Sequence, residues 1–149
     1  MLQTALVRRF ALSLGWLGVA PFAALACAAI IDTGLVSRGW ALQALAVYGG
    51  VILSFLGGTT WGAALCAQGA LGLSPRDLLV AIAASLIAFA GALAPPAYGL
   101  PLLAGGFLFA LVWDLRHIEA GLFPRWYKAL RFGLTACAIA ALGAGALSP

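Results

Sequence analysis

Long apolar runs separated by short polar or proline-containing breaks dominate the chain. A helix needs about 20 mostly apolar residues to cross the hydrocarbon core of a bilayer. Five runs are candidates for such helices, and they cover residues 10–31, 41–68, 74–94, 99–113 and 126–147. The pattern therefore predicts an all-α integral membrane bundle of five transmembrane helices.

Residues that begin or break helices stand between the runs. Ser74 is suited to cap a helix, and Pro75 is suited to its first position. Pro95-Pro96 is expected to end the third span and to turn the chain into the fourth. Pro124 separates the fourth span from the fifth. These breaks favour short connections between antiparallel neighbours.

Composition narrows the class of protein further. Of the 149 residues, 64% are hydrophobic and only 8% are charged, whereas soluble domains carry roughly 25% charged residues. So few charges cannot cover a surface that faces water, which excludes a soluble enzyme, a disordered chain and a disulfide-rich secreted module. We expect one five-helix transmembrane domain over residues 1–149.

The basic residues fall mainly on one side of the predicted bundle. If the N-terminus is cytoplasmic, the cytoplasmic segments hold Arg8, Arg9, Arg76, Arg116, Arg125, Lys128 and Arg131, and the other side holds only Arg38. The positive-inside rule then predicts the N-terminus inside and the C-terminus outside. An alternative for the first span is a signal peptide, but its apolar run exceeds the 7–15 residues typical of one.

Small residues recur at every fourth position of the second span, at Gly50, Ser54, Gly58 and Gly62. This spacing places them on one helix face, which lets another backbone approach closely. We therefore predict that the face is buried against protein, and a ligand or a partner helix is the alternative occupant. The residues predicted for helix packing or ligand lining are Gly50, Ser54, Gly57, Gly58, Thr60, Trp61 and Gly62.

No known catalytic or cofactor motif is present in the sequence. The single histidine, His117, is expected to be a solvated or interfacial side chain, and Trp113 is expected to lie in the aromatic belt. A metal site usually needs three or four ligands, and none converge in the sequence. We predict no catalytic residue, metal or cofactor, and the sequence favours a protein that is not an enzyme.

Asp114 and Arg131 are predicted to form an ion pair. Asp114 follows the apolar run of the fourth span, and Arg131 lies about one turn inside the fifth. A short loop between antiparallel helices brings these ends together, and a guanidinium can bind a carboxylate through two hydrogen bonds. The alternative is that each charge meets water or phosphate separately.

Three blocks of sequence are similar to a known family. They are Gly49-Gly50-Val51-Ile52-Leu53-Ser54-Phe55-Leu56-Gly57-Gly58 with Trp61-Gly62, the run from Pro124 to Thr135, and Gly18-Val19-Ala20-Pro21-Phe22. Together they resemble the domain of unknown function 3429 family, which includes transmembrane protein 69. Thr60 departs from the family pattern, in which His or Arg often precedes the tryptophan. The resemblance implies a small multi-pass protein of bacterial inner or mitochondrial membranes, with no established activity.

Two functions are compatible with these features. The first is a packing or assembly partner of other membrane proteins, through the small-residue face of the second span. The second is a binder or passive carrier of a lipid or small apolar molecule, in a cavity near Gly57, Thr60 and Trp61. The expected partners are membrane lipids and either another membrane protein or a second copy of the chain, with no nucleic acid. We expect the bacterial cytoplasmic membrane, with the mitochondrial inner membrane as the alternative.

Overall fold

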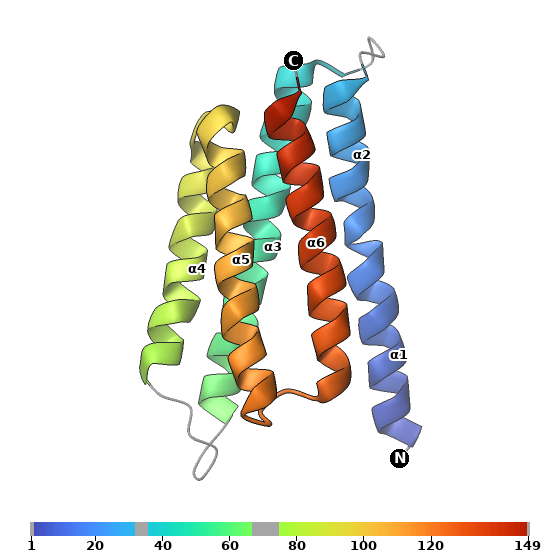
Figure 1. Cartoon of the computed structure of the whole chain (residues 1–149), viewed down its shortest axis with the longest axis vertical. Helices are drawn as coiled ribbons and strands as arrows, with labels where there is room; N and C mark the ends of the chain where they lie inside the picture. The colour runs from blue at the N-terminus through green and yellow to red at the C-terminus, as the bar shows by residue number, and fades with distance from the viewer. Residues whose placement is uncertain (1, 32–35, 67–74, 149) are drawn as a thin grey trace.

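The computed structural model describes residues 2–31, 36–66 and 75–148. These residues form a bundle of six helices (Figure 1). The helices are α1 (Leu2–Leu17), α2 (Val19–Ile30), α3 (Arg38–Cys66), α4 (Pro75–Leu93), α5 (Pro96–Glu119) and α6 (Arg125–Leu147).

Five segments are long and apolar enough to cross a membrane, because α1 and α2 together make one span, Ala5–Ile30. The predictions of an all-helical protein and of five spans are confirmed. The chain enters α1 at one end of the bundle and leaves α6 at the other, as five crossings require (Figure 1).

The helix boundaries differ from the predicted ones mainly at the start of the first span, where α1 begins at Leu2 instead of residue 10, and in the fourth span. The helix α5 covers Pro96–Glu119 and is longer at both ends than the expected residues 99–113. Pro96 occupies its first turn, where a missing N–H costs nothing. Beyond Trp113 the helix continues despite its charged residues. The expected cap Ser74 and the expected end of the second span at residue 68 lie outside the described residues.

A tight C-terminal cap directs the chain from α5 into α6. Gly121 has φ +79°, a left-handed conformation that favours glycine. The Gly121 N–H bonds the Ile118 carbonyl at 3.1 Å, and the Leu122 N–H bonds the His117 carbonyl at 2.9 Å. This pair of bonds is the Schellman pattern, which satisfies carbonyls that the helix end leaves free. The cap therefore lets α6 return beside the last turns of α5.

The first span is broken at Gly18, between α1 and α2. Pro21 has no N–H to continue the helical hydrogen bonds across this break. The Tyr48 hydroxyl of α3 donates to the Gly18 carbonyl at 2.9 Å, which links α3 to the first span at this residue. Among the described helices, α1 contacts α2 and α6 but not α3. Helix α1, the N-terminal half of the first span, therefore does not pack against α3.

The centre of the bundle is formed by α3 packed against α4 and α5. Helix α3 approaches α4 most closely at Gly50 and Gly57, where an added Cβ would lie 2.9 and 2.6 Å from α4 carbonyl oxygens. Gly106 of α5 leaves room for Leu53, which is fully buried. Small residues thus bring these three backbones together, as is common in membrane bundles.

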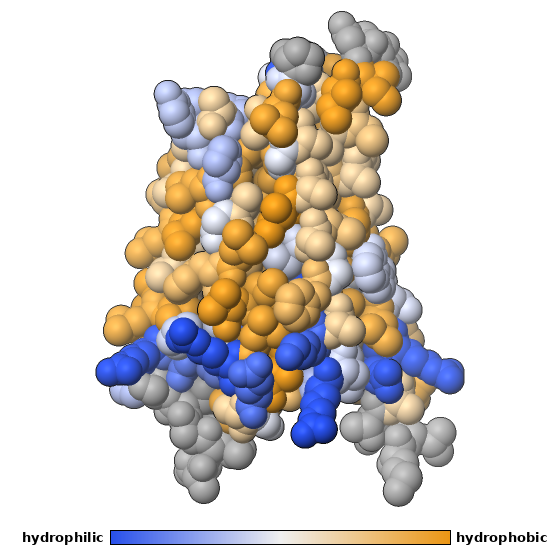
Figure 2. All heavy atoms as spheres, viewed as in Figure 1, coloured by the Kyte–Doolittle hydropathy of each residue, from blue (hydrophilic) through white to orange (hydrophobic). Residues whose placement is uncertain are grey.

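Hydrophilic side chains gather in a band near one end of the molecule, and apolar side chains cover most of the rest of the visible face (Figure 2). The band lies at the end where α1 begins and where α5 turns into α6. We call this the charged end. The sequence-predicted basic residues apart from Arg38 belong to helix segments at this end.

Candidate functional site

A buried ion pair connects α5 to α6 near the charged end. Arg131 Nε donates to Asp114 Oδ2 at 2.5 Å, and the two residues are only 2% and 3% exposed. The structure therefore brings together the two residues that the sequence paired. The pair lies well inside the helices, because α5 extends to Glu119 and α6 begins at Arg125.

A second buried cluster joins the start of α4 to α5. The Asp77 carboxylate accepts a hydrogen bond from the Trp113 indole N–H at 2.9 Å and lies 2.8 Å from His117 Nε2. Asp77 and His117 are 5% and 6% exposed. The expectation that His117 is solvated or interfacial is therefore wrong, because Asp77 supplies a charged partner within the bundle.

Trp113 also differs from its predicted role as a belt residue. It is half-buried, and its indole N–H bonds Asp77. Trp113 and His117 are four residues apart, so they share one face of α5. That spacing is the signal from which the cluster could have been found, but its partner is 36 residues away from Trp113.

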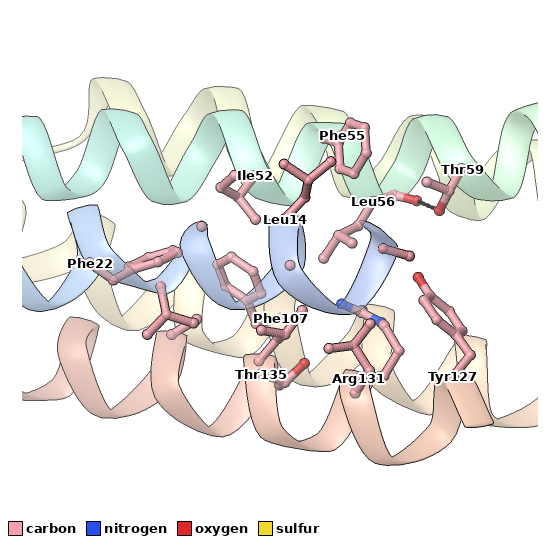
Figure 3. A pocket seen from close by; sticks show the side chains of 17 residues that line it. Leu14, Phe22, Ile52, Phe55, Leu56, Thr59, Phe107, Tyr127, Arg131 and Thr135 are labelled. Atoms are coloured by element: carbon pink, nitrogen blue, oxygen red, sulfur yellow. Dashed lines mark hydrogen bonds between the residues drawn. The ribbon is translucent and has the colours of Figure 1, made fainter. Parts of the chain in front are cut away.

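An apolar cavity of about 410 Å³ lies between the first span, α3 and α6. Figure 3 shows Leu14 on α1, Phe55 on α3 and Arg131 on α6. Its lining is Ala11, Leu14, Gly15, Gly18, Val19, Phe22, Ile52, Phe55, Leu56, Thr59, Phe107, Tyr127, Leu130, Arg131, Leu134, Thr135 and Ala138. It lies where α1 and α3 do not pack together.

The polar atoms in the cavity lining come from few residues. Thr59 donates its hydroxyl to the Leu56 carbonyl at 2.7 Å, so its proton is already used. Arg131 Nη2 and Thr135 Oγ1 are buried and have no hydrogen-bond partner among the described residues. The cavity is thus an apolar space whose α6 wall carries the Tyr127 hydroxyl and these two buried groups, Arg131 Nη2 and Thr135 Oγ1.

The small-residue face of α3 is only partly buried within the chain. Gly50 packs on α4, and Ser54 Oγ lies 3.3 Å from Ser85 Oγ of α4. Gly58 is exposed, and an added Cβ at Gly58 or Gly62 would meet no atom within 4 Å. Within the chain, close packing of this face is therefore seen at Gly50 and Ser54, and burial of Gly58 and Gly62 against another protein stays a prediction.

The packed line on α3 is instead rotated toward Gly57 and Thr60. Gly57 is buried against α4, and Thr60 is 4% exposed. Trp61 is 39% exposed and lines a shallow recess of about 330 Å³ together with Ser54 and Gly58. The cavity between the first span, α3 and α6 is lined by other α3 residues. The predicted lining residues Gly57, Thr60 and Trp61 are therefore not part of it.

The arrangement offers no cage for a metal ion within the described part of the chain, where no three His, Cys, Asp or Glu side chains gather. Its chemistry is that of hydrogen bonding and apolar contact. The two buried clusters join α4, α5 and α6 near the charged end, and Arg131 of the ion pair also lines the cavity.

The fold and the cavity define a small multi-pass helical membrane protein with five spans. The chain belongs to a family described as a protein of unknown function, DUF3429, whose model matches residues 7–147. No curated protein and no solved structure matches the chain.

Proposed function

We propose that this protein binds a small apolar molecule inside the membrane, in the cavity between the first span, α3 and α6. The cavity itself carries the proposal. Its volume of about 410 Å³ lies within the roughly 300–1,000 Å³ that is typical of small-molecule sites. Its walls are mainly aliphatic and aromatic side chains, which suit an acyl chain or an apolar ring that fits this volume.

The position of the cavity supports entry from the bilayer. Leu14 of α1 and Phe55 of α3 both line it, yet they are 62% and 66% exposed. These side chains stand at its lateral mouth, between helices that do not contact each other. An apolar molecule can therefore pass from lipid to cavity without crossing water.

A filled cavity tests this function. Ala11→Trp places a large ring in the cavity from α1, and we expect it to weaken binding of a fluorescent apolar probe at least about tenfold, which corresponds to the loss of about 1.4 kcal/mol. Ser13→Trp is the matched control, because Ser13 is exposed on the same helix and is not part of the lining.

The measurement is probe titration on the purified protein in lipid nanodiscs, with native mass spectrometry to detect lipid that remains bound. Ser13→Trp should bind like the parent. If Ala11→Trp also binds the probe and retains lipid like the parent, the cavity is not a binding site.

A second candidate function is assembly with another membrane protein or with a second copy of the chain. The observation that favours it is the exposed Gly58, beside Trp61 in the recess on α3 and α4. A partner helix could approach the backbone closely at this point. Residence in a bacterial cytoplasmic or a mitochondrial inner membrane is part of either proposal.

Gly58→Leu tests assembly at a position where an added Cβ meets no atom within 4 Å. Assembly predicts that Gly58→Leu reduces the mass of the complex extracted from native membranes. Gly105→Leu is the control, since Gly105 is exposed on α5 with no atom near an added Cβ. An unchanged mass for Gly58→Leu would remove this face from consideration.

A further inference from the structure

We propose that the ligand of the cavity carries a neutral hydrogen-bond acceptor, a carbonyl oxygen, which Arg131 Nη2 and Thr135 Oγ1 hold on the α6 wall. This inference rests on the proposed binding function and names the class of molecule bound. The ligand would be a lipophilic ketone, quinone or ester, with its apolar part between α1 and α3.

The two polar groups lie together on α6. Arg131 and Thr135 are four residues apart, so both face the same side of the helix. Each is only 2% exposed, and both line the cavity. Figure 3 shows the two side chains on the α6 side of the cavity. The two donors therefore belong to one wall of the cavity, where the ligand carbonyl would bind.

Arg131 Nη2 and Thr135 Oγ1 can each still donate a hydrogen bond. Arg131 uses Nε for Asp114, while Nη2 has no partner among residues 2–31, 36–66 and 75–148. The same holds for Thr135 Oγ1 within those ranges. A buried donor without an acceptor is unfavourable, because it loses its hydrogen bonds to water and gains none. An acceptor on the ligand would remove that penalty.

The charge of the site argues for a neutral acceptor. The Asp114 carboxylate already balances the Arg131 guanidinium. A ligand carboxylate would add an unpaired negative charge beside Asp114 in an apolar space, where an isolated charge is costly. A carbonyl group uses the same donors without adding charge. The cavity should thus prefer a ketone or an ester over a fatty acid of equal length.

The preference can be measured with three probes of equal chain length: undecane, 2-undecanone and undecanoic acid. Each displaces the fluorescent apolar probe from the parent protein in nanodiscs, and each affinity is corrected for partition into protein-free nanodiscs. We expect the ketone to bind at least about tenfold more tightly than the alkane, and the acid to bind more weakly than the ketone.

Two variants assign that preference to the α6 wall. Thr135→Val keeps the shape and removes the hydroxyl, so it should reduce the affinity for the ketone relative to the affinity for the alkane. Arg131→Lys retains the charge opposite Asp114 but lacks Nη2, and it should have the same effect. If Arg131→Lys fails to fold, Thr135→Val alone still decides.

The outcomes separate this inference from the function on which it rests. If the alkane and the ketone displace the probe equally, the site binds apolar molecules without a carbonyl anchor, and this inference is wrong. If the acid binds best, the neutral acceptor is wrong. If none of the three displaces the probe, the binding function itself fails. If the ketone is preferred, the same displacement assay is repeated with a short-chain ubiquinone analogue and with dioctanoylglycerol. The one that binds more tightly shows whether the natural ligand carries a ring carbonyl or an ester carbonyl.

Discussion

At the scale of single residues, the ion pair between Asp114 and Arg131 is a short, buried polar contact between α5 and α6. Both residues are almost completely buried, with 2.5 Å between Arg131 Nε and Asp114 Oδ2. Each partner makes burial of the other tolerable, since an unpaired charge at this depth is costly. The pair should therefore hold α5 and α6 together at the charged end.

A double-mutant cycle measures this coupling. Asp114→Ala and Arg131→Ala should each lower the free energy of unfolding by about 3 kcal/mol or more, because each leaves a buried charge without its partner. The double variant should be little worse than either single variant. The measurement is equilibrium unfolding in detergent micelles, and strict additivity of the two losses would contradict the pair.

The chain also contains a matched control for this cycle. Lys128 and Glu119 form an ion pair between the same two helices at 3.9 Å, with both side chains largely exposed. Exposed pairs contribute about 0–1 kcal/mol. Removing either partner should therefore change stability far less than removing Asp114 or Arg131.

The residue contacts differ in how far the sequence could predict them. Asp114 and Arg131 are 17 residues apart across one short turn, so chain geometry alone brings them together. His117 and Asp77 are 40 residues apart on helices whose relative rotation is set by packing. The helix period places Trp113 and His117 on one face, but it does not identify the helix that this face meets.

At the scale of helices, the close contact between α3 and α4 depends on glycines that the four-residue stripe only partly included. Gly50 belongs to the stripe and packs on α4, whereas Gly57 packs on α4 from the neighbouring position. A packed face of a long helix drifts from a strict four-residue repeat, because one turn holds 3.6 residues. The sequence could thus predict a glycine-based contact but not its exact line.

This difference predicts opposite results for two adjacent substitutions. A Cβ at Gly57 would lie 2.6 Å from the Ala81 carbonyl oxygen, so Gly57→Ala must push α3 from α4. Overpacking of this kind costs about 1–3 kcal/mol. A Cβ at Gly58 meets open space, so Gly58→Ala should leave stability unchanged or slightly raised.

Thermal unfolding of the two variants in the same detergent provides the comparison. Gly57→Ala should melt at a clearly lower temperature than Gly58→Ala, although the two changes add the same methyl group. Equal melting temperatures would mean that α3 and α4 adjust freely at this contact.

At the scale of the whole molecule, basic residues and chain direction together predict an orientation. Helix α1 begins at the charged end, the link from α5 to α6 lies there, and α6 finishes at the opposite end (Figure 1). Of the eight basic residues, only Arg38 belongs to the opposite end. Because basic segments are retained in the cytoplasm, the charged end should face inward.

Reporter fusions at three described positions test that orientation, with the N-terminus inside and five crossings. Green fluorescent protein fused after Ala120, in the link between α5 and α6, should fluoresce, because this link is predicted to be cytoplasmic. Alkaline phosphatase should instead be active after Pro95 and after Ser148, which lie at the other end. Replacing Arg8 and Arg9 by Gln should lower the fraction of correctly inserted molecules, since these residues help to retain the N-terminus inside. Fluorescence after Ser148 together with phosphatase activity after Ala120 would overturn the orientation while leaving the five-helix bundle intact.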